Sequence, residues 1–264
     1  MNILDKILLH KREEIEVRKG LVTEAELMAS KYFHRPCTSL MASLKKPTST
    51  GIIAEFKRKS PSKGFINQHA DVETITTAYT NANAAGLSVL TDHEFFGGST
   101  NDLVKARECS ALPILRKDFI VDTYQIMASK AMGADVILLI AACLTKSEVQ
   151  FLAAFAKEIK LEVILELHDE GEIDHICESV DMVGINNRNL KTFAVDINRS
   201  LKMAKLLPID CIKIAESGIN EVSAIKRFRD AGFQGFLMGE RFMKEEDPAK
   251  AFQEFVSQLN NTTG

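Results

Sequence analysis

An acid and a base stand two residues apart in one strand-like segment, a spacing that suits acid–base catalysis. Glu55 and Lys57 end an apolar run that begins at Ile52, and a polar loop containing Pro61 and Gly64 follows. Because side chains alternate along a strand, Glu55 and Lys57 are expected to point to the same side. Desolvating both groups costs free energy, which is tolerated either for chemistry or for a structural ion pair. This segment by itself leaves both interpretations open.

Polar side chains also end most of the other strand-like runs. Any one of them is more often part of a loop salt bridge than a catalyst, but their number favours a shared site. The run Asp135–Ile140 is the apolar exception and could supply one wall of a pocket. The polar groups are Glu55 and Lys57, Thr91 and Asp92, Arg116 to Asp118, Glu166 and His168, Asn186 and Arg188, Glu216 to Gly218, and Gly239 with Glu240.

Two glycine-containing turns in the last third of the chain indicate a phosphate site. Ser217-Gly218 and Gly239-Glu240 each follow an expected strand. In many parallel barrels the backbone N–H groups at these two places converge on an anion, and glycine allows the close backbone approach. The alternative is that both are simply tight turns, but their paired placement favours phosphate.

Eight short apolar runs must position these groups, and they predict an α/β fold. Their starts lie roughly 20 to 35 residues apart, the length of a strand, a loop and a helix. Amphipathic stretches at Lys146–Lys160, Asn220–Ala231 and Val72–Ala85 lie between them, with Gly86 placed where a helix would stop. The count predicts a (β/α)8 TIM barrel. A large open parallel sheet is the alternative, although the chain has no G-x-G-x-x-G or Walker loop. The runs are Ile52–Phe56, Leu87–Thr91, Pro113–Lys117, Asp135–Ile140, Glu162–Leu167, Met182–Asn186, Ile212–Glu216 and Gly235–Gly239.

Residues 1–48 precede the first strand and predict an N-terminal helical extension. Their apolar positions indicate an amphipathic helix with Lys and Glu on its outer face, and Thr38–Leu44 indicates a second short piece. This part has too little apolar content to fold alone. We therefore expect residues 1–264 to form a single barrel domain, with 1–48 packed on it. The apolar positions of the first helix are Ile3, Leu4, Ile7, Leu8 and Ile15.

The composition excludes several classes of function. With 264 residues, 45% hydrophobic, 26% charged and a net charge of -3, the chain is typical of soluble globular proteins and predicts neither nucleic acid nor membrane as a partner. The five cysteines are scattered without a C-x-x-C pair, which predicts no disulfide and no metal site. His168 is interpreted as a loop or rim residue without a partner. The N-terminus lacks a signal peptide, so a cytoplasmic location is expected. A monomer is also expected.

Together these residues resemble the indole-3-glycerol-phosphate synthase family over nearly the whole chain. The segments Ile53–Ser62 and Pro113–Ile120 are highly specific, whereas the Ser-Gly and Gly-Glu turns are shared with other phosphate-binding barrels. The other segments that carry the resemblance are Ile3–Ile7, Lys11–Glu14, Leu87–Asp92, Glu166–Glu170, Gly184–Leu190, Ala215–Ile219 and Phe236–Glu240.

The resemblance implies a reaction that needs no cofactor and no metal. Its substrate would be the small phosphorylated molecule 1-(2-carboxyphenylamino)-1-deoxyribulose 5-phosphate, converted to indole-3-glycerol phosphate, carbon dioxide and water. Lys117 would be the general acid at the ketone oxygen, with its pKa lowered by neighbouring cations and partial desolvation. Glu166 would serve acid–base steps in the dehydration, assisted by Lys57. Glu55 and Asn186 would hold the amine and hydroxyl region of the substrate.

The resemblance also implies how the substrate is held. Arg188 suits the planar carboxylate of the anthranilate ring. The polar loop 58–64 is expected to be a mobile lid that closes over the substrate. The remaining implied contacts are the phosphate-binding residues Ser60, Ser217, Gly218, Gly239 and Glu240, the ring-flanking residues Pro61, Phe96 and Phe119, and Glu216 and Leu237.

Three alternatives are weighed against this interpretation. Phosphoribosylanthranilate isomerase is a related barrel, but it would be expected to use an early cysteine, and the first strand run here ends without one. A Schiff-base aldolase would use Lys117 or Lys57 as its nucleophile. A barrel that only binds phosphate metabolites would not explain so many charged strand ends.

Overall fold

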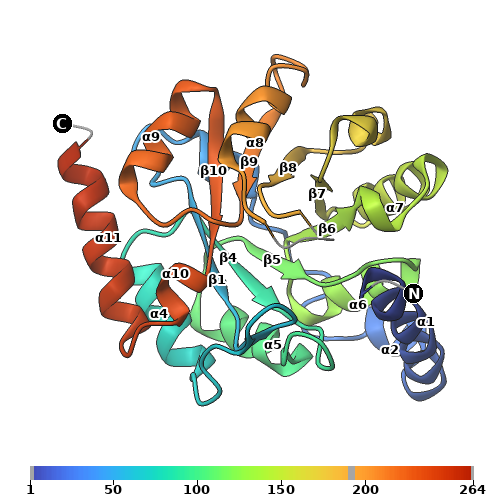
Figure 1. Cartoon of the computed structure of the whole chain (residues 1–264). Coiled ribbons are helices and arrows are strands. Elements are labelled where there is room, and N and C mark those ends of the chain that lie inside the picture. The colour runs from blue at the N-terminus through green and yellow to red at the C-terminus, as the bar shows by residue number, and fades with distance from the viewer. Residues whose placement is uncertain (1–2, 190–193, 263–264) are drawn as a thin grey trace.

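The computed structural model describes residues 3–189 and 194–262. Among them, eight parallel strands close into a barrel in which each strand pairs with its neighbours in chain order and β1 pairs with β10 (Figure 1). The predicted (β/α)8 barrel is therefore confirmed, and the open-sheet alternative is wrong. The barrel strands are β1 (Ile52–Phe56), β4 (Gly86–Leu90), β5 (Ile114–Lys117), β6 (Val136–Ile140), β7 (Glu162–Leu167), β8 (Met182–Asn186), β9 (Ile212–Glu216) and β10 (Phe233–Met238).

Helices cover the outside of the barrel between successive strands (Figure 1). The three expected amphipathic stretches are all helical, and each is shorter than expected. Thr145 forms a capping box with Glu148 that fixes the start of α7. The outer helices are α4 (Val72–Asn81), α5 (Thr100–Cys109), α6 (Thr123–Met132), α7 (Lys146–Glu158), α8 (Ile197–Met203), α9 (Val222–Asp230), α10 (Glu240–Met243) and α11 (Pro248–Thr262), with 3-10 turns η1 (Ala141–Cys143) and η2 (Glu170–His175).

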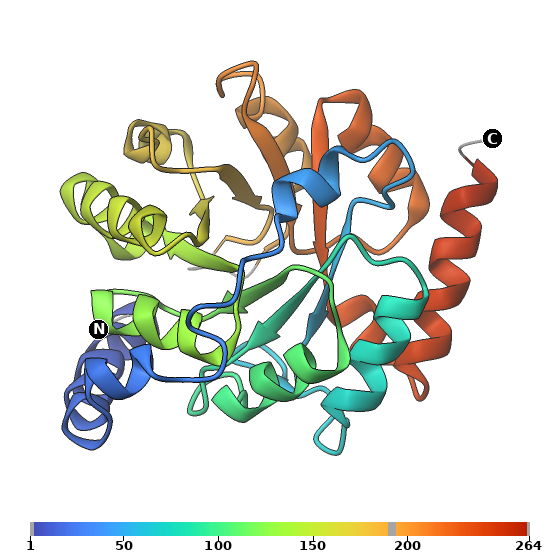
Figure 2. The ribbon, with the colours of Figure 1, turned by 180° about the vertical axis from the view of Figure 1, so that it is seen from behind.

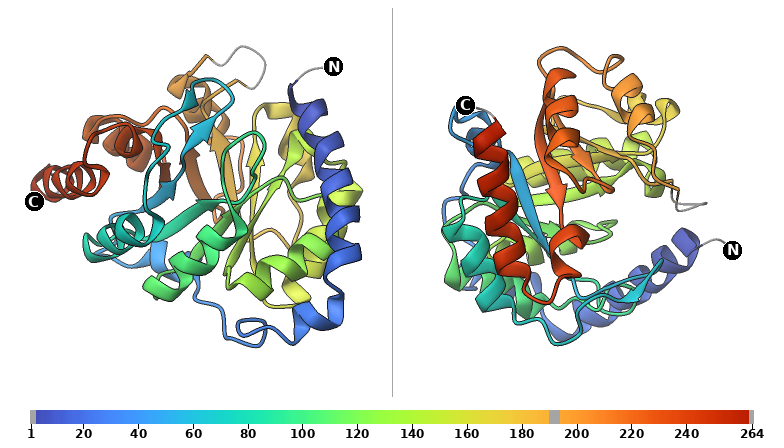
Figure 3. Two further views of the ribbon diagram at one scale, coloured as in Figure 1. Left: turned by 90° about the horizontal axis from the view of Figure 1, so that it is seen from below. Right: turned by 60° about the vertical axis from the view of Figure 1, so that its left-hand side comes forward.

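The N-terminal extension contains three helices: α1 (Ile3–Leu21), α2 (Glu24–Met28) and α3 (Leu40–Lys45). Helix α2 was not expected from the sequence. Figure 3 shows α1 and α11 on different sides of the barrel, and in Figure 2 the segment between α2 and β1 crosses one end of it. The assignment of residues 1–264 to a single domain stays a prediction.

Gly86 has a different role from the helix stop that the sequence suggested. Helix α4 ends at Asn81, and Asn83 takes the left-handed conformation with a φ of 63°. Gly86 is instead the first residue of β4, and a Cβ atom there would lie 2.8 Å from Leu40 Cδ1. The glycine leaves room for Leu40 of α3, which packs against the inward-facing strand residues.

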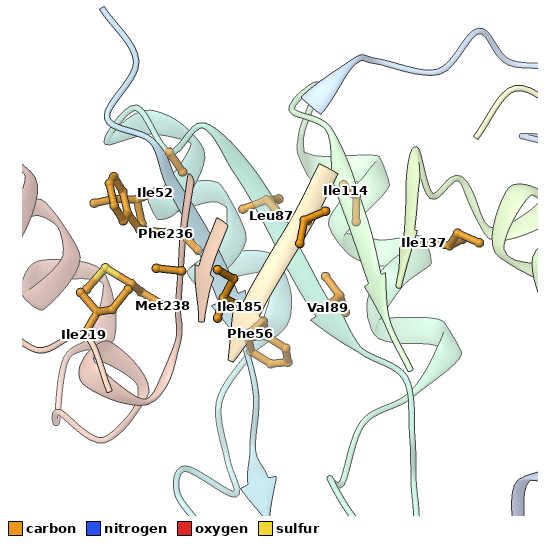
Figure 4. Packing of buried hydrophobic residues seen from close by; sticks show 14 of the residues in the cluster. Ile52, Phe56, Leu87, Val89, Ile114, Ile137, Ile185, Ile219, Phe236 and Met238 are labelled. Carbon is orange, nitrogen blue, oxygen red and sulfur yellow. The ribbon is translucent and has the colours of Figure 1, made fainter. Parts of the chain in front are cut away.

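Alternation along the strands separates two apolar cores. Ile52 and Phe56 face outward and pack with residues such as Phe236 beneath the helices (Figure 4). The intervening residue Ile53 faces the barrel interior, where a second cluster contains Leu115, Ile164 and Ile214 of other strands. Residues two positions further along each of these strands must also point inward. This rule aims Glu55, Lys117, Glu166 and Glu216 at the barrel axis.

A buried carboxylate at the opposite end of the strands gives a stability prediction. Asp135 is 0% exposed and accepts hydrogen bonds from Arg107 Nη1 at 2.8 Å, Arg35 Nη2 at 2.5 Å and Thr38 N at 2.7 Å. Asp135→Asn is expected to lower the free energy of unfolding by about 3–5 kcal/mol, because a buried arginine loses its counter-charge. Urea unfolding followed by circular dichroism measures the change.

The matched control is Asp174→Asn. Asp174 also pairs with a basic residue, Lys146, but both side chains are 59% exposed, so this pair contributes little. The control should shift the urea midpoint far less than Asp135→Asn. Equal shifts for the two variants would contradict the prediction.

Candidate active site

A cavity of about 420 Å³ lies at the C-terminal ends of the strands, and every residue selected from the sequence as catalytic or substrate-binding lines it. Leu138 and Ile140 of β6 supply an apolar wall, as expected for that strand. The structure thus brings the selected residues together, while their individual roles stay predictions. Strands supply Glu55, Lys117, Glu166, Asn186, Glu216 and Leu237, and the segments after them supply Lys57, Ser60, Pro61, Phe96, Phe119, Arg188, Ser217, Gly218, Gly239 and Glu240.

Acidic side chains surround the ammonium of Lys117. Its Nζ lies 2.8 Å from Glu166 Oε2 and 3.5 Å from Glu216 Oε2. Asn186 Nδ2 donates a hydrogen bond of 3.0 Å to the other Glu166 oxygen. Lys57 and Glu55 form the second acid–base pair, with Nζ and Oε1 2.6 Å apart. The same-side arrangement inferred from their spacing is therefore confirmed.

The expectation that cations lower the pKa of Lys117 is wrong. Burial by itself lowers this pKa, but the nearby carboxylates, Glu166 first, outweigh burial and raise it above its ordinary value. The side chain of Lys117 is therefore protonated and positively charged near neutral pH before the substrate binds. The prediction failed because the inward-facing carboxylates come from other strands, far from Lys117 in the sequence.

The two carboxylates beside Lys117 take opposite protonation states. Burial raises the pKa of Glu166, but Lys117 and His168 outweigh it, and this pKa lies well below its usual range. Burial together with the charge of Glu166 raises the pKa of Glu216 to about 8. Near neutral pH the cluster therefore holds an ionised Glu166, a protonated Glu216 and a charged Lys117.

His168 lies behind the cavity lining, in contact with Glu166, and was expected to have no partner. It is 7% exposed rather than a rim residue, and its Nε2 lies 3.0 Å from Glu166 Oε1. Its backbone N–H donates to Glu172 Oε2 at 2.6 Å, which fixes the chain after β7. The signal was its spacing: His168 follows Glu166 by two residues, so both point to the same side.

The polar loop after β1 is a small antiparallel hairpin formed by β2 (Lys59–Ser60) and β3 (Gly64–Phe65). Lys63 near its tip places Nζ 2.6 Å from Glu240 Oε1. The other oxygen of Glu240 lies 3.4 Å from Arg188 Nη2. Glu240 thus joins the hairpin to the segment after β8 at the cavity rim. Closure of this hairpin over a substrate stays a prediction.

The turn after β9 has the backbone expected of a functional loop. Ser217 has a φ of 68° and Gly218 a φ of 71°. A left-handed serine is uncommon and costs conformational free energy, so surrounding contacts must hold it. Asn187 Nδ2 supplies one by donating a hydrogen bond of 2.7 Å to Ser217 O. A Cβ atom on Gly218 would overlap Val195, so the turn requires glycine.

Helix α1 contributes to the cavity, which the sequence analysis did not foresee. Ile3, Leu4 and Ile7 line it. Lys11 also differs from the expectation that lysines face outward, because its side chain is 1% exposed. The signal was present in the sequence: Lys11 lies four residues after Ile7 and four before Ile15, on the same helical face.

The described part of the chain was also searched for membrane-spanning helices and for metal sites. None of the described helices is long and apolar enough to cross a membrane. Within residues 3–189 and 194–262, no group of three or more His, Cys, Asp or Glu side chains is placed to hold a metal ion. Leu190, the last residue of one segment that carries the family resemblance, lies outside the described residues.

Comparison with known proteins gives a family for this arrangement. The model of the family "Indole-3-glycerol phosphate synthase" matches residues 4–255. The indole-3-glycerol phosphate synthase of Bacteroides thetaiotaomicron is 45% identical over 258 residues, covering 98% of this chain and 99% of the relative. That of Polaromonas sp. strain JS666 is 42% identical, covering 95% of this chain and 96% of the relative.

Solved structures with low sequence identity share the fold. The 3-hexulose-6-phosphate synthase of Salmonella typhimurium superposes with a TM-score of 0.63 at 13% identity, covering 80% of this chain and 99% of that one. A mutant tryptophan synthase alpha-subunit from Pyrococcus furiosus gives a TM-score of 0.59 at 12% identity, covering 80% of this chain and 98% of that one. At such identities the likeness shows the barrel alone.

Proposed function

Because the chain belongs to the indole-3-glycerol phosphate synthase family, we propose that its barrel cavity closes the indole ring with Lys117 as the general acid. The activity is that of a carboxy-lyase of tryptophan biosynthesis, which converts 1-(2-carboxyphenylamino)-1-deoxyribulose 5-phosphate to indole-3-glycerol phosphate, carbon dioxide and water. The observation that carries the assignment of Lys117 is its contact of 2.8 Å with Glu166 inside the cavity.

Ring closure needs a proton donor at the ketone oxygen, and Lys117 suits this step. A ring carbon attacks the carbonyl, and negative charge develops on the oxygen. Although its pKa is raised, an ammonium is still a stronger acid than the hydroxyl that forms, so proton transfer remains favourable. The carboxylates around Lys117 keep it charged and fixed before the substrate arrives, which lowers the reorganisation needed in the transition state.

The later steps need a base and a second acid. After decarboxylation, loss of water requires a proton on the departing hydroxyl and removal of a proton from the ring carbon between the nitrogen and the carbon that carries the hydroxyl. Glu166 is ionised and can accept that proton. Lys57 lies 2.6 Å from Glu55, which orients it as the donor to the hydroxyl. Asn186 holds Glu166 through a hydrogen bond of 3.0 Å.

Different residues of the cavity are proposed to bind the phosphate and the carboxylate of the substrate. The left-handed turn at Ser217 and Gly218 can present backbone N–H groups to the proposed phosphate, and Ser60 of the hairpin lines the same cavity. Arg188 is the proposed partner of the anthranilate carboxylate. Its present partner, Glu240, lies 3.4 Å away, a weak contact that an incoming planar carboxylate can replace with a bidentate one.

The protonated state of Glu216 gives a pH prediction. Near pH 8 this carboxyl loses its proton, since burial and the charge of Glu166 raise its pKa to about 8. The new charge beside Lys117, added to those of Glu166 and Glu55, raises the pKa of the ammonium further and makes it a weaker acid. We expect kcat to fall roughly fivefold between pH 7 and pH 9.5.

The Glu216→Gln variant is the matched test of this pH dependence. Glutamine is neutral at every pH, so the fall above pH 8 should disappear in the variant. The measurement is kcat against pH for both proteins at saturating substrate. An alkaline fall that persists unchanged in Glu216→Gln would show that another group causes it.

A direct assay tests the proposed activity. The protein is mixed with the carboxyphenylamino substrate, and product formation is followed by indole fluorescence. The chain contains no tryptophan, so the protein background is low. A folded protein that binds the substrate without a fluorescence rise would contradict the assignment. Borohydride trapping separates the aldolase alternative, because only a Schiff base between lysine and substrate would be reduced to a stable adduct.

We also propose that the protein acts as a cytoplasmic monomer, without a cofactor or metal. The five scattered cysteines without a C-x-x-C pair support a reducing compartment and the absence of a zinc site. Size-exclusion chromatography with light scattering measures the mass in solution, to be compared with the 29.3 kDa of one chain.

A further inference from the structure

The ammonium of Lys11 is buried where α1 meets the segments that follow β4 and β5. Its Nζ lies 3.0 Å from Asp92 Oδ2, 3.0 Å from Asp118 Oδ1 and 2.7 Å from Glu14 Oε2. The side chains of Lys11, Asp92 and Asp118 are each only 1% exposed. Removing three charges from water is costly, so such a cluster is weak evidence for stability alone. Its position suggests what else it does.

The two aspartates that bind Lys11 also bind the backbone of aromatic residues. Asp92 Oδ1 accepts hydrogen bonds from the N–H groups of Phe95 at 2.8 Å and Phe96 at 3.0 Å. Asp118 Oδ1 accepts one from Phe119 N at 2.8 Å. One ammonium therefore fixes two carboxylates, and these fix the backbone that carries two rings.

Those two rings form a wall of the cavity. The centroids of Phe96 and Phe119 lie 5.9 Å apart with their planes inclined by 40°, and both residues line the cavity. The helix that carries Lys11 places Ile7 in the same lining. The cluster of Lys11, Asp92 and Asp118 thus connects three parts of the chain that supply apolar residues to the cavity. These parts are α1, the segment after β4 and the segment after β5.

Charge balance in this cluster depends on Lys11. Burial raises the pKa of Asp118, but Arg116 and Lys11 outweigh it and hold this pKa at about 2. Arg116 Nη2 and Thr91 Oγ1 contact the other Asp118 oxygen, at 2.9 Å and 2.5 Å. Without Lys11, the carboxylates of Asp92 and Asp118 would face each other across its vacated site. Their repulsion would separate the two aromatic segments.

We propose that Lys11 is a positioning residue that holds Phe96 and Phe119 as a preformed slot for the aromatic ring of the substrate. It acts through Asp92 and Asp118 and touches neither the substrate nor the reacting atoms. The inference rests on the proposed function, which supplies the carboxyphenyl ring. Preforming the slot removes part of the ordering cost of binding and therefore strengthens binding of the ring.

The test compares ligands with and without the ring. The first ligand is the substrate reduced to the alcohol at its ketone carbon, which cannot react, and the second is inorganic phosphate. Lys11→Met should weaken the reduced substrate about tenfold, in keeping with lost aromatic contacts, and change phosphate affinity less than about twofold. In turnover, KM should rise about tenfold with kcat changed less than about threefold. Equal weakening of both ligands, or of neither, would overturn the proposal.

Lys19→Met is the matched control on the same helix. Lys19 also ties α1 to the barrel, because its Nζ lies 2.8 Å from Asp122 Oδ2 at the start of α6. It does so at an exposed position, with 37% of its side chain accessible. This variant should leave both affinities at the wild-type values. A loss equal to that of Lys11→Met would show that any tether of α1 suffices and would overturn the specific role of Lys11.

A second variant guards against misfolding. The double variant Lys11→Met/Asp92→Asn removes one positive and one negative charge, and asparagine can still accept the hydrogen bonds from Phe95 and Phe96. It should show a selective loss of ring affinity that is smaller than that of Lys11→Met, because the repulsion between positions 92 and 118 is gone while the connection to α1 is still missing. Wild-type selectivity would overturn the proposal. If neither variant folds, amide exchange in the wild type decides. The amides of Phe96 and Phe119 should open together with those of α1, and independent opening would overturn the proposal.

These outcomes remain distinct from a failure of the proposed function. A wild-type protein that does not bind the reduced substrate would contradict the function itself. A wild-type protein that binds it tightly, with an unselective Lys11→Met variant, would contradict only the role of Lys11.

Discussion

Lys117→Met is expected to lower kcat about 10³-fold while leaving phosphate affinity near the wild-type value. Methionine has a similar length but neither charge nor proton. The ketone oxygen then loses the donor that is held 2.8 Å from Glu166, and negative charge develops on it without a partner. The effect is large because the side chains of Lys117 and Glu166 are only 16% and 3% exposed, and a fixed charge acts more strongly at such a site than in solvent.

The measurement is the fluorescence assay at saturating substrate. Lys213→Met is the matched control, because Lys213 is a buried lysine of β9 that bonds to the carbonyl of Pro208, 3.4 Å away, rather than facing the cavity. Its kcat should stay within about threefold of wild type. A loss of less than tenfold in Lys117→Met would rule out the proposed general acid.

Lys117→Arg separates charge from proton donation. Arginine keeps a positive charge near Glu166, but its guanidinium is too weak an acid to give up its proton. If Lys117 both stabilises charge and transfers the proton, this variant should recover only part of the activity lost in Lys117→Met. Full recovery would show that the charge alone is required.

Glu166→Gln is expected to lower kcat about 10²- to 10³-fold, the second largest effect. Glutamine is similar in size and can still bond to Asn186, but it cannot accept the proton from the ring carbon next to the nitrogen. It also removes the closest carboxylate beside Lys117, so the pKa of the ammonium should fall. Ring closure should therefore suffer less than dehydration, and a single-turnover experiment should show an intermediate that has lost carbon dioxide but retains its hydroxyl.

Glu172→Gln is the matched control for this variant. Glu172 accepts a hydrogen bond of 2.6 Å from the backbone N–H of His168, so it supports the same strand end without facing Lys117. Its kcat should remain within about tenfold of wild type, since only positioning is disturbed. Loss of activity in Glu172→Gln equal to that in Glu166→Gln would remove the evidence for a base at Glu166.

The sequence determined which residues could meet, through local periodicity. Alternation along β1 placed Ile53, Glu55 and Lys57 on one side, and the structure shows Glu55 and Lys57 2.6 Å apart. Position after an apolar run selected other polar residues of the cavity, although Thr91, Asp92, Arg116 and His168, chosen in the same way, do not line it, and the resemblance supplied Phe96, Phe119 and Pro61. The inference from alternation succeeds because the period of a strand depends only on backbone geometry. The eight runs likewise predicted the barrel, while the open-sheet alternative was excluded only by the pairing of β1 with β10 in the structure.

Only the tertiary structure decided the electrostatics of the site. The partner of Lys117 is Glu166, 49 residues away in the chain, and a Coulomb interaction depends on distance in space rather than in sequence. The sequence therefore gave no basis for the sign of the pKa shift of Lys117, and His168 was taken for a rim residue although it contacts Glu166.

The burial of Lys11 and the role of Gly86 were decided in the same way. Lysines were expected on the outer face of α1, although Lys11 shares the periodicity of Ile7 and Ile15. The carboxylates that make its burial tolerable belong to segments after β4 and β5. Position 86 requires glycine because Leu40 of α3, a helix distant in the sequence, packs against it. Local sequence determines which way a side chain points, whereas its neighbours are set only when the barrel closes and brings distant strands together.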